Sequence, residues 1–174
     1  MEAINYRKKI RNAAEGGGVD RYSGLVISVG SSIFQWLAFG IAFYSAWKVK
    51  EDWLHPLFWV GLATVVSGML LRMHCWRVLG EFFTHTVTIA DNHRVVDNGA
   101  YRWIRHPSYL GALLTLIGLG LALGNYGSIA LLVIGSMAVY IYRIETEEAA
   151  LESALGDSYT QFKKTRKRLI PFVY

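Results

Sequence analysis

The chain has 174 residues, of which 53% are hydrophobic and only 18% are charged, with a net charge of +5. This composition is too apolar for an ordinary soluble protein, and the length predicts one membrane-embedded domain over residues 1–174. The single cysteine, Cys75, excludes an intramolecular disulfide framework. Basic residues lie beside apolar segments rather than in a stripe, which argues against nucleic-acid binding.

Four apolar runs predict an all-α integral membrane protein with about four transmembrane helices. They cover residues 24–47, 53–71, 108–124 and 126–142. A helix needs about 20 residues to cross the hydrocarbon core. The polar N-terminus lacks the early apolar core of a cleavable signal, so we expect the first span to be retained. The last two runs are joined by Gly124-Asn-Tyr-Gly127, which predicts a tight helical hairpin.

The segment at residues 72–107 connects the second run to the third. Its β-prone part, residues 82–90, predicts a short hairpin or an interfacial loop. Pro107 disfavours the helical conformation for His106, so the third helix should begin at Pro107 or Ser108. The free backbone N–H groups of that first turn suit an anionic or strongly hydrogen-bonding ligand group.

Helix-forming residues continue beyond the fourth run until Gly156 ends the pattern. Arg143 and Glu147 are four residues apart on this helix, so they share a face where the helix leaves the lipid. Such a pair is either an exposed ion pair of about 0.2 to 0.5 kcal/mol or part of a site. The basic run from Lys163 to Arg168 predicts a segment that contacts anionic lipid headgroups.

The distribution of Lys and Arg predicts the orientation of the spans. The N-terminal stretch, the middle loop and the C-terminal stretch contain five, five and six of these residues, and the two remaining connections contain two and none. Loops rich in Lys and Arg face the cytoplasm. We therefore expect both termini and the middle loop to be cytosolic.

Hydrogen-bond donors and aromatic rings are concentrated at Tyr101, Arg102, Arg105, His106 and Tyr109, which predicts a binding cradle. On local sequence alone, His106 also fits a cap or loop residue. The five histidines lack tight ligand spacing such as H-x-x-x-H, so no metal site is expected. Neither a G-x-G-x-x-G nor a G-x-x-x-x-G-K-[ST] motif is present, so a nucleotide-like cofactor must be held in another way.

An ordered set of short pieces within residues 79–171 resembles the membrane-embedded isoprenylcysteine carboxyl methyltransferase family and its phospholipid N-methyltransferase relatives. The pieces are His93-Arg-Val-Val96, Gly99-Ala-Tyr101, Arg105-His-Pro-Ser-Tyr109 with Gly111, Asn125, Arg143 with Glu147-Glu148, Leu151, Gly156, Tyr159 and Arg168-Leu-Ile-Pro171. The ordered set is much more specific than the Arg105 to Tyr109 piece alone.

The resemblance implies a methyltransferase that uses S-adenosylmethionine without a Rossmann domain, with a cofactor pocket between the cytosolic loop and the C-terminal segment. It implies that Arg143 orients the substrate, that Glu147 binds the charged methionine end of the cofactor, and that Glu148 is a neighbour. The implied cofactor contacts are His93, Arg94, Val95, Val96, Tyr101, His106, Pro107, Ser108, Tyr109 and Glu147. The implied substrate is a lipophilic acceptor that enters from the bilayer, with carboxyl methylation of an isoprenylcysteine-like group favoured.

Three other functions fit parts of the pattern. The acceptor could be a phospholipid amine or a small thiol, which must lose a proton where a carboxylate need not. Membrane sterol reductases that use NADPH are similar to this family in their C-terminal region, although the chain is short for one. A non-enzymatic scaffold would use the loop and basic tail to bind lipid headgroups, but it does not explain the clustering of Tyr101, His106 and Glu147.

Overall fold

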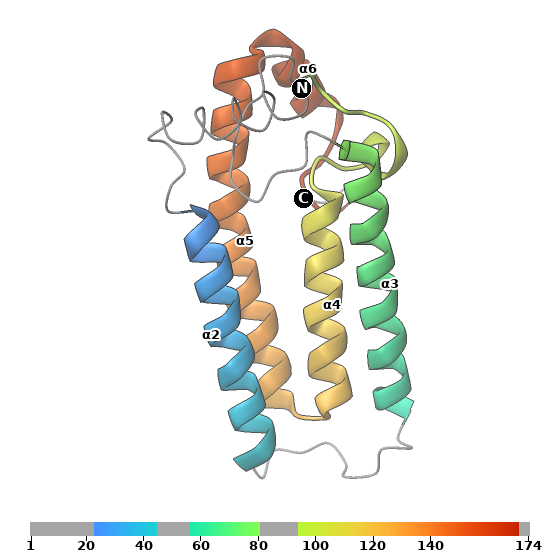
Figure 1. The fold of residues 1–174 in the computed structure, drawn as a ribbon, viewed down its shortest axis with the longest axis vertical. Helices are drawn as coiled ribbons and strands as arrows, with labels where there is room; N and C mark the ends of the chain where they lie inside the picture. The colour runs from blue at the N-terminus through green and yellow to red at the C-terminus, as the bar shows by residue number, and fades with distance from the viewer. Residues whose placement is uncertain (1–22, 45–55, 81–93, 171–174) are drawn as a thin grey trace, which may run out of the picture.

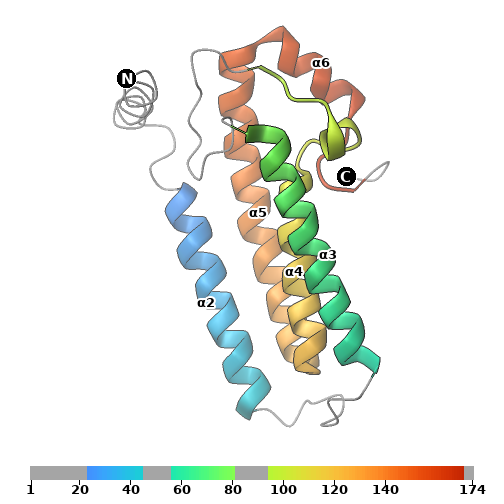
Figure 2. The same ribbon diagram turned by 45° about the vertical axis from the view of Figure 1, so that its right-hand side comes forward.

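The computed structural model describes residues 23–44, 56–80 and 94–170, so the β-prone stretch at 82–90 and His93 lie outside the described residues. Within these ranges the regular elements are helices. They are α2 (Ser23–Tyr44), α3 (Pro56–Leu79), the 3₁₀ helix η2 (Gly99–Arg102), α4 (Pro107–Leu123), α5 (Tyr126–Leu155) and α6 (Asp157–Thr165). Four of them run along a common direction, while α6 turns across one end of the bundle (Figures 1 and 2).

The predicted hairpin is formed by α4 and α5, which are joined at the end of the bundle opposite α6 (Figure 1). The turn is short because Gly124 adopts a left-handed conformation with φ 60° after α4. The Asn125 side chain then accepts a hydrogen bond of 3.0 Å from the Ser128 backbone N–H and caps α5. The Ser128 hydroxyl also donates to the Ala38 carbonyl at 2.7 Å, which ties α5 to α2.

Glycines allow α3 and α4 to pack closely along much of their length. A Cβ atom placed on Gly68 would lie 2.5 Å from the Gly111 carbonyl oxygen, and one placed on Gly118 would lie 2.6 Å from the Gly61 carbonyl oxygen. Neither approach leaves room for a side chain. In lipid, no hydrophobic force drives helices together, so their association depends on close van der Waals packing. Small residues permit that close approach.

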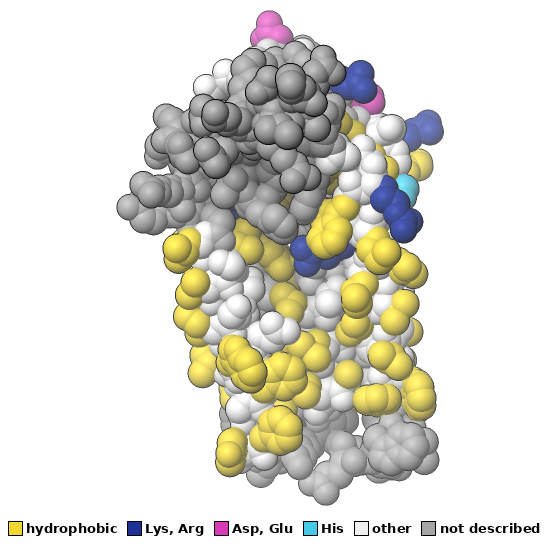
Figure 3. All heavy atoms as spheres, viewed as in Figure 1, with side chains coloured by type: hydrophobic (Ala, Val, Ile, Leu, Met, Phe, Trp, Pro, Cys, Tyr) yellow, Lys and Arg dark blue, Asp and Glu magenta, His cyan; other side chains and the backbone are white. Residues whose placement is uncertain are grey.

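Among the described residues, three helices are long and apolar enough to cross a membrane: α2, α3 and α5. The fourth apolar helix, α4, has 17 residues. Large apolar side chains on α2 and α3, such as Trp36 and Leu70, are exposed, as expected for surfaces that face lipid. Figure 3 shows hydrophobic side chains over the lower part of one face, with the coloured Lys and Arg side chains in its upper half. The chain is therefore an integral membrane protein.

The helix that carries the second predicted span, residues 53–71, extends beyond that span. The helix α3 continues to Leu79. The residues after Leu71 are more polar, but they contain no helix breaker before Gly80, which has φ 53°. The extra two turns bring Cys75 into the buried interior beside the segment that precedes α4. Hydropathy shows where the apolar part of a helix ends, but the helix itself can continue into polar residues.

Candidate functional site

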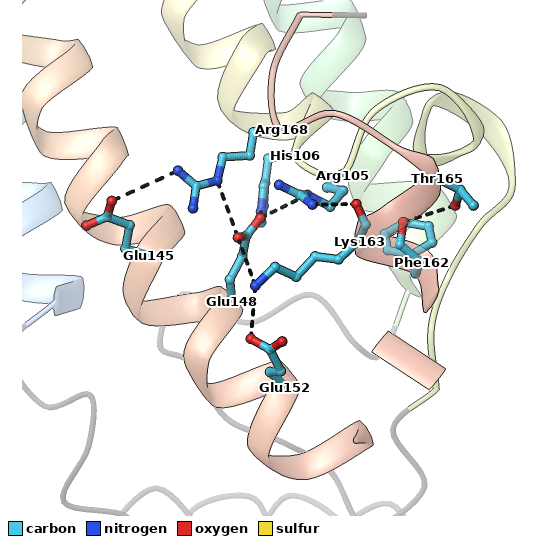
Figure 4. Close-up of polar contacts among 9 residues, drawn as sticks. All are labelled: Arg105, His106, Glu145, Glu148, Glu152, Phe162, Lys163, Thr165 and Arg168. Atoms are coloured by element: carbon cyan, nitrogen blue, oxygen red, sulfur yellow. Dashed lines mark hydrogen bonds and ion pairs between the residues drawn. The ribbon is translucent and has the colours of Figure 1, made fainter. Parts of the chain in front are cut away.

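A buried carboxylate, that of Glu148 on α5, lies at the centre of an ion-pair cluster at the end of the bundle (Figure 4). Its Oε1 atom lies 2.9 Å from Arg105 Nε and 3.1 Å from His106 Nε2. Its Oε2 atom lies 3.3 Å from Arg168 Nε and 4.0 Å from Lys163 Nζ. The surrounding cations compensate for the cost of burying this charge.

The backbone places these cations around Glu148 by pairing two segments that are far apart in the sequence. Ile104 and Lys167 form an isolated parallel β-bridge. The Arg105 N–H donates to the Lys167 carbonyl at 2.9 Å, and the His106 N–H donates to the Arg168 carbonyl at 3.0 Å. The residues before α4 (104–106) and those after α6 (167–168) therefore form one wall of the cluster. The ion pairs of Glu148 join this wall to α5.

The start of α4 and the end of α5 are also joined by Tyr109. Its hydroxyl donates to Glu147 Oε2 at 2.6 Å and accepts from Arg143 Nε at 3.2 Å. Arg143 and Glu147 lie one helical turn apart on α5, and the Arg143 side chain is buried. The predicted pair is thus part of a three-residue chain of hydrogen bonds that joins two helices, and it is not merely an exposed ion pair.

Aromatic rings line this chain of hydrogen bonds. The His106 and Tyr109 ring centroids are 5.7 Å apart, and those of Tyr109 and Tyr140 are 5.6 Å apart. Tyr101 on η2 is also buried, and desolvation by burial raises the pKa of its phenol. Tyr101 is therefore neutral at physiological pH and remains a hydrogen-bond donor, with the Cys75 side chain as a partner.

The structure brings some of the predicted site residues together and leaves others apart. Hydrogen bonds and ring contacts join His106, Tyr109, Arg143 and Glu147 to one another or to Glu148, while the buried Tyr101 contacts Cys75. Pro107 and Ser108 form the first turn of α4, as predicted from Pro107. Arg94, Val95 and Val96 lie in an irregular segment that leads into η2, with Arg94 exposed and the two valines half-buried.

The central place of Glu148 was not predicted from the sequence. The cluster from Tyr101 to Tyr109 has no carboxylate of its own, and Glu148 supplies one from α5, 42 residues after His106. His106 is the N-cap of α4, but its side chain makes no capping hydrogen bond and turns to Glu148 instead. A usable signal was the surplus of cations at Arg105 and Lys163 to Arg168, which requires a partner acid if either segment is buried.

The charged and aromatic side chains around Tyr109 have the chemistry to hold a positively charged group. Among the described residues, no three His, Cys, Asp or Glu side chains are grouped in a way that could hold a metal. The Glu147 carboxylate and the Tyr109 ring beside it supply negative charge and π-electron density. Both attract a sulfonium or an ammonium group.

Fold and site together define an integral membrane protein with a cluster of buried charged and aromatic side chains where α4 begins. A family model described as the isoprenylcysteine carboxyl methyltransferase (ICMT) family matches residues 59–153. This match covers more than half of the chain. The chain belongs to the isoprenylcysteine carboxyl methyltransferase family.

Individual relatives agree with this assignment. The protein-S-isoprenylcysteine O-methyltransferase of Schizosaccharomyces pombe is 37% identical over 114 residues, which are 64% of this chain and 48% of that protein. The Xenopus laevis enzyme of the same name is 34% identical, over 66% of this chain and 40% of its own length. A solved structure of the eukaryotic intramembrane Ras methyltransferase ICMT matches with a TM-score of 0.69 and 30% identity, over 82% of this chain and 51% of that one. The chain spans about half the length of these relatives.

Proposed function

We propose that this chain transfers a methyl group from S-adenosylmethionine to the carboxylate of a lipophilic acceptor, with an isoprenylated cysteine as the favoured acceptor group. The observation that carries the proposal is the hydrogen-bonded chain of Arg143, Tyr109 and Glu147, which places a cation and an anion side by side at the membrane end of the site. The relatives' names, which specify protein-S-isoprenylcysteine, support the choice of acceptor.

The acidic and aromatic side of the site suits the cofactor. When bound, the cofactor would supply a methyl group attached to a positively charged sulfur. A carboxylate oxygen that attacks the methyl carbon displaces this sulfur, and no proton has to be removed. Glu147 would bind the ammonium group of the methionine end. The other residues that would line the cofactor are His93, Arg94, Val95, Val96, Tyr101, His106, Pro107, Ser108 and Tyr109.

Arg143 would hold the acceptor. Its guanidinium group can bind a carboxylate by charge-assisted hydrogen bonds and orient it for in-line attack. A carboxylate is already ionised at neutral pH, so this chemistry needs alignment and exclusion of water more than a general base. The buried position of Arg143 and its bond to Tyr109 limit its motion, which favours alignment.

The position of the site relative to the membrane is also part of the proposal. We infer that α4 crosses the bilayer with α2, α3 and α5, giving four crossings that leave both termini and the site in the cytosol. Two facts support this inference: α4 runs alongside α3 and contains no charged residue, and Lys and Arg are concentrated in alternate connections. The cofactor would then enter from the cytosol and the acceptor from the lipid.

Transfer of a labelled methyl group tests the proposal. The full chain in nanodiscs is supplied with labelled S-adenosylmethionine and, in parallel, with S-farnesylated cysteine, a phospholipid amine and a lipophilic thiol. We expect methyl ester formation on the farnesylated cysteine. Arg143→Gln should abolish it, and Arg77→Gln, an exposed arginine on α3, should not. Absence of transfer to all three acceptors by folded wild type would overturn the proposal.

A further inference from the structure

Two surface segments that lie side by side make a strip beside the start of α4. Ile104 and Lys167 form the parallel bridge that joins them, and Arg105 N–H donates to the Lys167 carbonyl at 2.9 Å. The residues just before the bridge make a second contact between the segments, because Arg166 Nε donates to the Arg102 carbonyl at 3.2 Å. The side chains around the bridge are therefore held on one continuous piece of surface.

Four exposed side chains lie in or next to this bridge, and we call them the headgroup surface: Arg102, Trp103, Lys167 and Ile170. Trp103 is 63% exposed and Ile170 is 49% exposed. The Arg102 guanidinium carbon lies 5.7 Å from the Trp103 ring centroid, and Lys167 is exposed as well. Exposed aromatic and basic side chains together are typical of protein surfaces at the headgroup level of a bilayer.

The headgroup surface lies at the height of a membrane-spanning helix end. η2, which carries Arg102, packs against the last turns of α3: a Cβ atom on Gly99 would lie 2.7 Å from His74 Nε2 and 3.0 Å from Val78 Cγ2. Trp103 also precedes the first residue of the apolar helix α4, Pro107, by only four positions. A tryptophan in this position is expected to sit at the headgroup level.

Three basic residues near Lys167 and Arg102 are paired with acidic side chains. Lys163 is paired with Glu152 at 2.9 Å, and Arg168 is paired with Glu148 at 3.3 Å. Arg166 lies 3.9 Å from the Asp97 carboxylate. Within the described part of the chain, no acidic side chain forms an ion pair with Arg102 or Lys167.

We propose that the headgroup surface binds the phosphate of an anionic phospholipid from the leaflet at this end of the molecule. Arg102 and Lys167 supply positive charge, while Trp103 and Ile170 supply apolar contact for the lipid beneath the phosphate. The sequence predicted that the whole run from Lys163 to Arg168 contacts lipid, and this proposal assigns the contact to fewer of its residues. Lys163, Arg166 and Arg168 already form ion pairs with acidic residues of the protein.

Lipid binding here also stabilises the wall of the candidate site. The backbone of Lys167 accepts a hydrogen bond from Arg105, and the next residue, Arg168, accepts one from His106. A ligand that holds Lys167 in place therefore favours the paired arrangement of both segments. A ligand that binds the folded state alone raises its stability by mass action.

Titration of fluorescent phosphatidylglycerol into the full chain in neutral detergent tests the proposal. We expect Arg102→Gln and Lys167→Gln each to weaken binding by about fivefold, which corresponds to about 1 kcal/mol per cation. Lys164→Gln is the matched control, because Lys164 is also exposed but lies on α6 and is not part of the headgroup surface. Independently of any variant, binding to the wild type should weaken as ionic strength rises.

Two competitors and the control variant distinguish a phospholipid site on this surface from general attraction of anions. Phosphatidylcholine with the same acyl chains should compete poorly, and inorganic phosphate should not compete at comparable concentration. Equal weakening by Lys164→Gln would mean that general positive charge attracts the lipid, and it would overturn the proposal. Unchanged affinity in Arg102→Gln and Lys167→Gln, equal binding of phosphatidylcholine, or full competition by inorganic phosphate would each overturn it too.

Discussion

The Tyr109 hydroxyl donates a 2.6 Å hydrogen bond to the Glu147 carboxylate, joining the first turn of α4 to the end of α5. Because the same hydroxyl accepts from Arg143 Nε at 3.2 Å, one phenol holds the two charged residues of the candidate site in position. The relative placement of Glu147 and Arg143, the proposed cofactor and acceptor residues, thus depends on Tyr109.

Tyr109→Phe removes this hydroxyl and keeps the ring. We expect the affinity for S-adenosylmethionine to fall about tenfold or more, because a hydrogen bond to a charged group contributes about 1.5 to 3 kcal/mol. Isothermal titration calorimetry on the protein in detergent measures the change. Tyr142→Phe, at an exposed position on α5, is the control. An unchanged dissociation constant in Tyr109→Phe would show that this hydroxyl does not organise the site.

Glu148→Gln replaces the buried carboxylate with an amide of the same shape. Arg105 and Arg168 then lose the negative charge that compensates them, and removal of one partner from a buried ion pair costs about 3 to 5 kcal/mol. We expect a large drop in the thermal unfolding midpoint. Glu145→Gln, on the exposed side of the same helix, should change it little. Similar midpoints for the two variants would contradict the assigned role of Glu148.

Much of the fold follows from the sequence, and the reasons are local. Long apolar runs require helices in lipid, Pro107 begins α4, and Gly124 and Gly156 end α4 and α5. The helix α3 extends past its apolar span because no helix breaker precedes Gly80, and hydropathy does not record this.

The candidate site is only partly predictable for a related reason. Tyr109, Arg143 and Glu147 belong to short motifs and helical spacing, so the sequence identifies them. The burial of Glu148 depends on a bridge between Ile104 and Lys167, two residues far apart in the chain. The surplus of cations in the two segments indicates a partner acid, but a single sequence does not show that Ile104 and Lys167 pair, since each segment is short and irregular by itself.

Gly68→Ala tests the close packing of α3 on α4. The new methyl group would lie 2.5 Å from the Gly111 carbonyl oxygen, so the helices must move apart. We expect a loss of about 1 to 3 kcal/mol in stability, typical of overpacking. Gly40→Ala on α2 is the matched control because no atom lies within 4 Å of its added Cβ. Unfolding in detergent should leave Gly40→Ala at or above wild type and Gly68→Ala well below it.

The buried Tyr159 phenol on α6 predicts how stability depends on alkaline pH. Burial raises its pKa above the ordinary value of 10.0, so the folded chain keeps a proton that the unfolded chain loses. The unfolding free energy should therefore fall as pH rises above 10, by up to about 1.4 kcal/mol per pH unit from this group. Tyr159→Phe should reduce that slope.

At neutral pH the same substitution should be neutral or stabilising. The Tyr159 hydroxyl is buried and has no hydrogen-bond partner among the described residues, so its removal leaves no group unsatisfied. Unfolding midpoints across the pH range on either side of 10 measure both effects. Tyr126→Phe, at an exposed position, serves as the control. An identical alkaline slope in Tyr159→Phe and wild type would contradict the predicted retention of the proton.

The most direct test of the central claim is calorimetric binding of S-adenosylmethionine to the purified chain and to Glu147→Gln, with Glu145→Gln as the control. The two acids lie two residues apart on α5, but only Glu147 is joined to Tyr109. We predict saturable binding by wild type and Glu145→Gln and a loss of at least about tenfold in Glu147→Gln. Equal affinity in all three proteins, or no binding by folded wild type, would contradict the account.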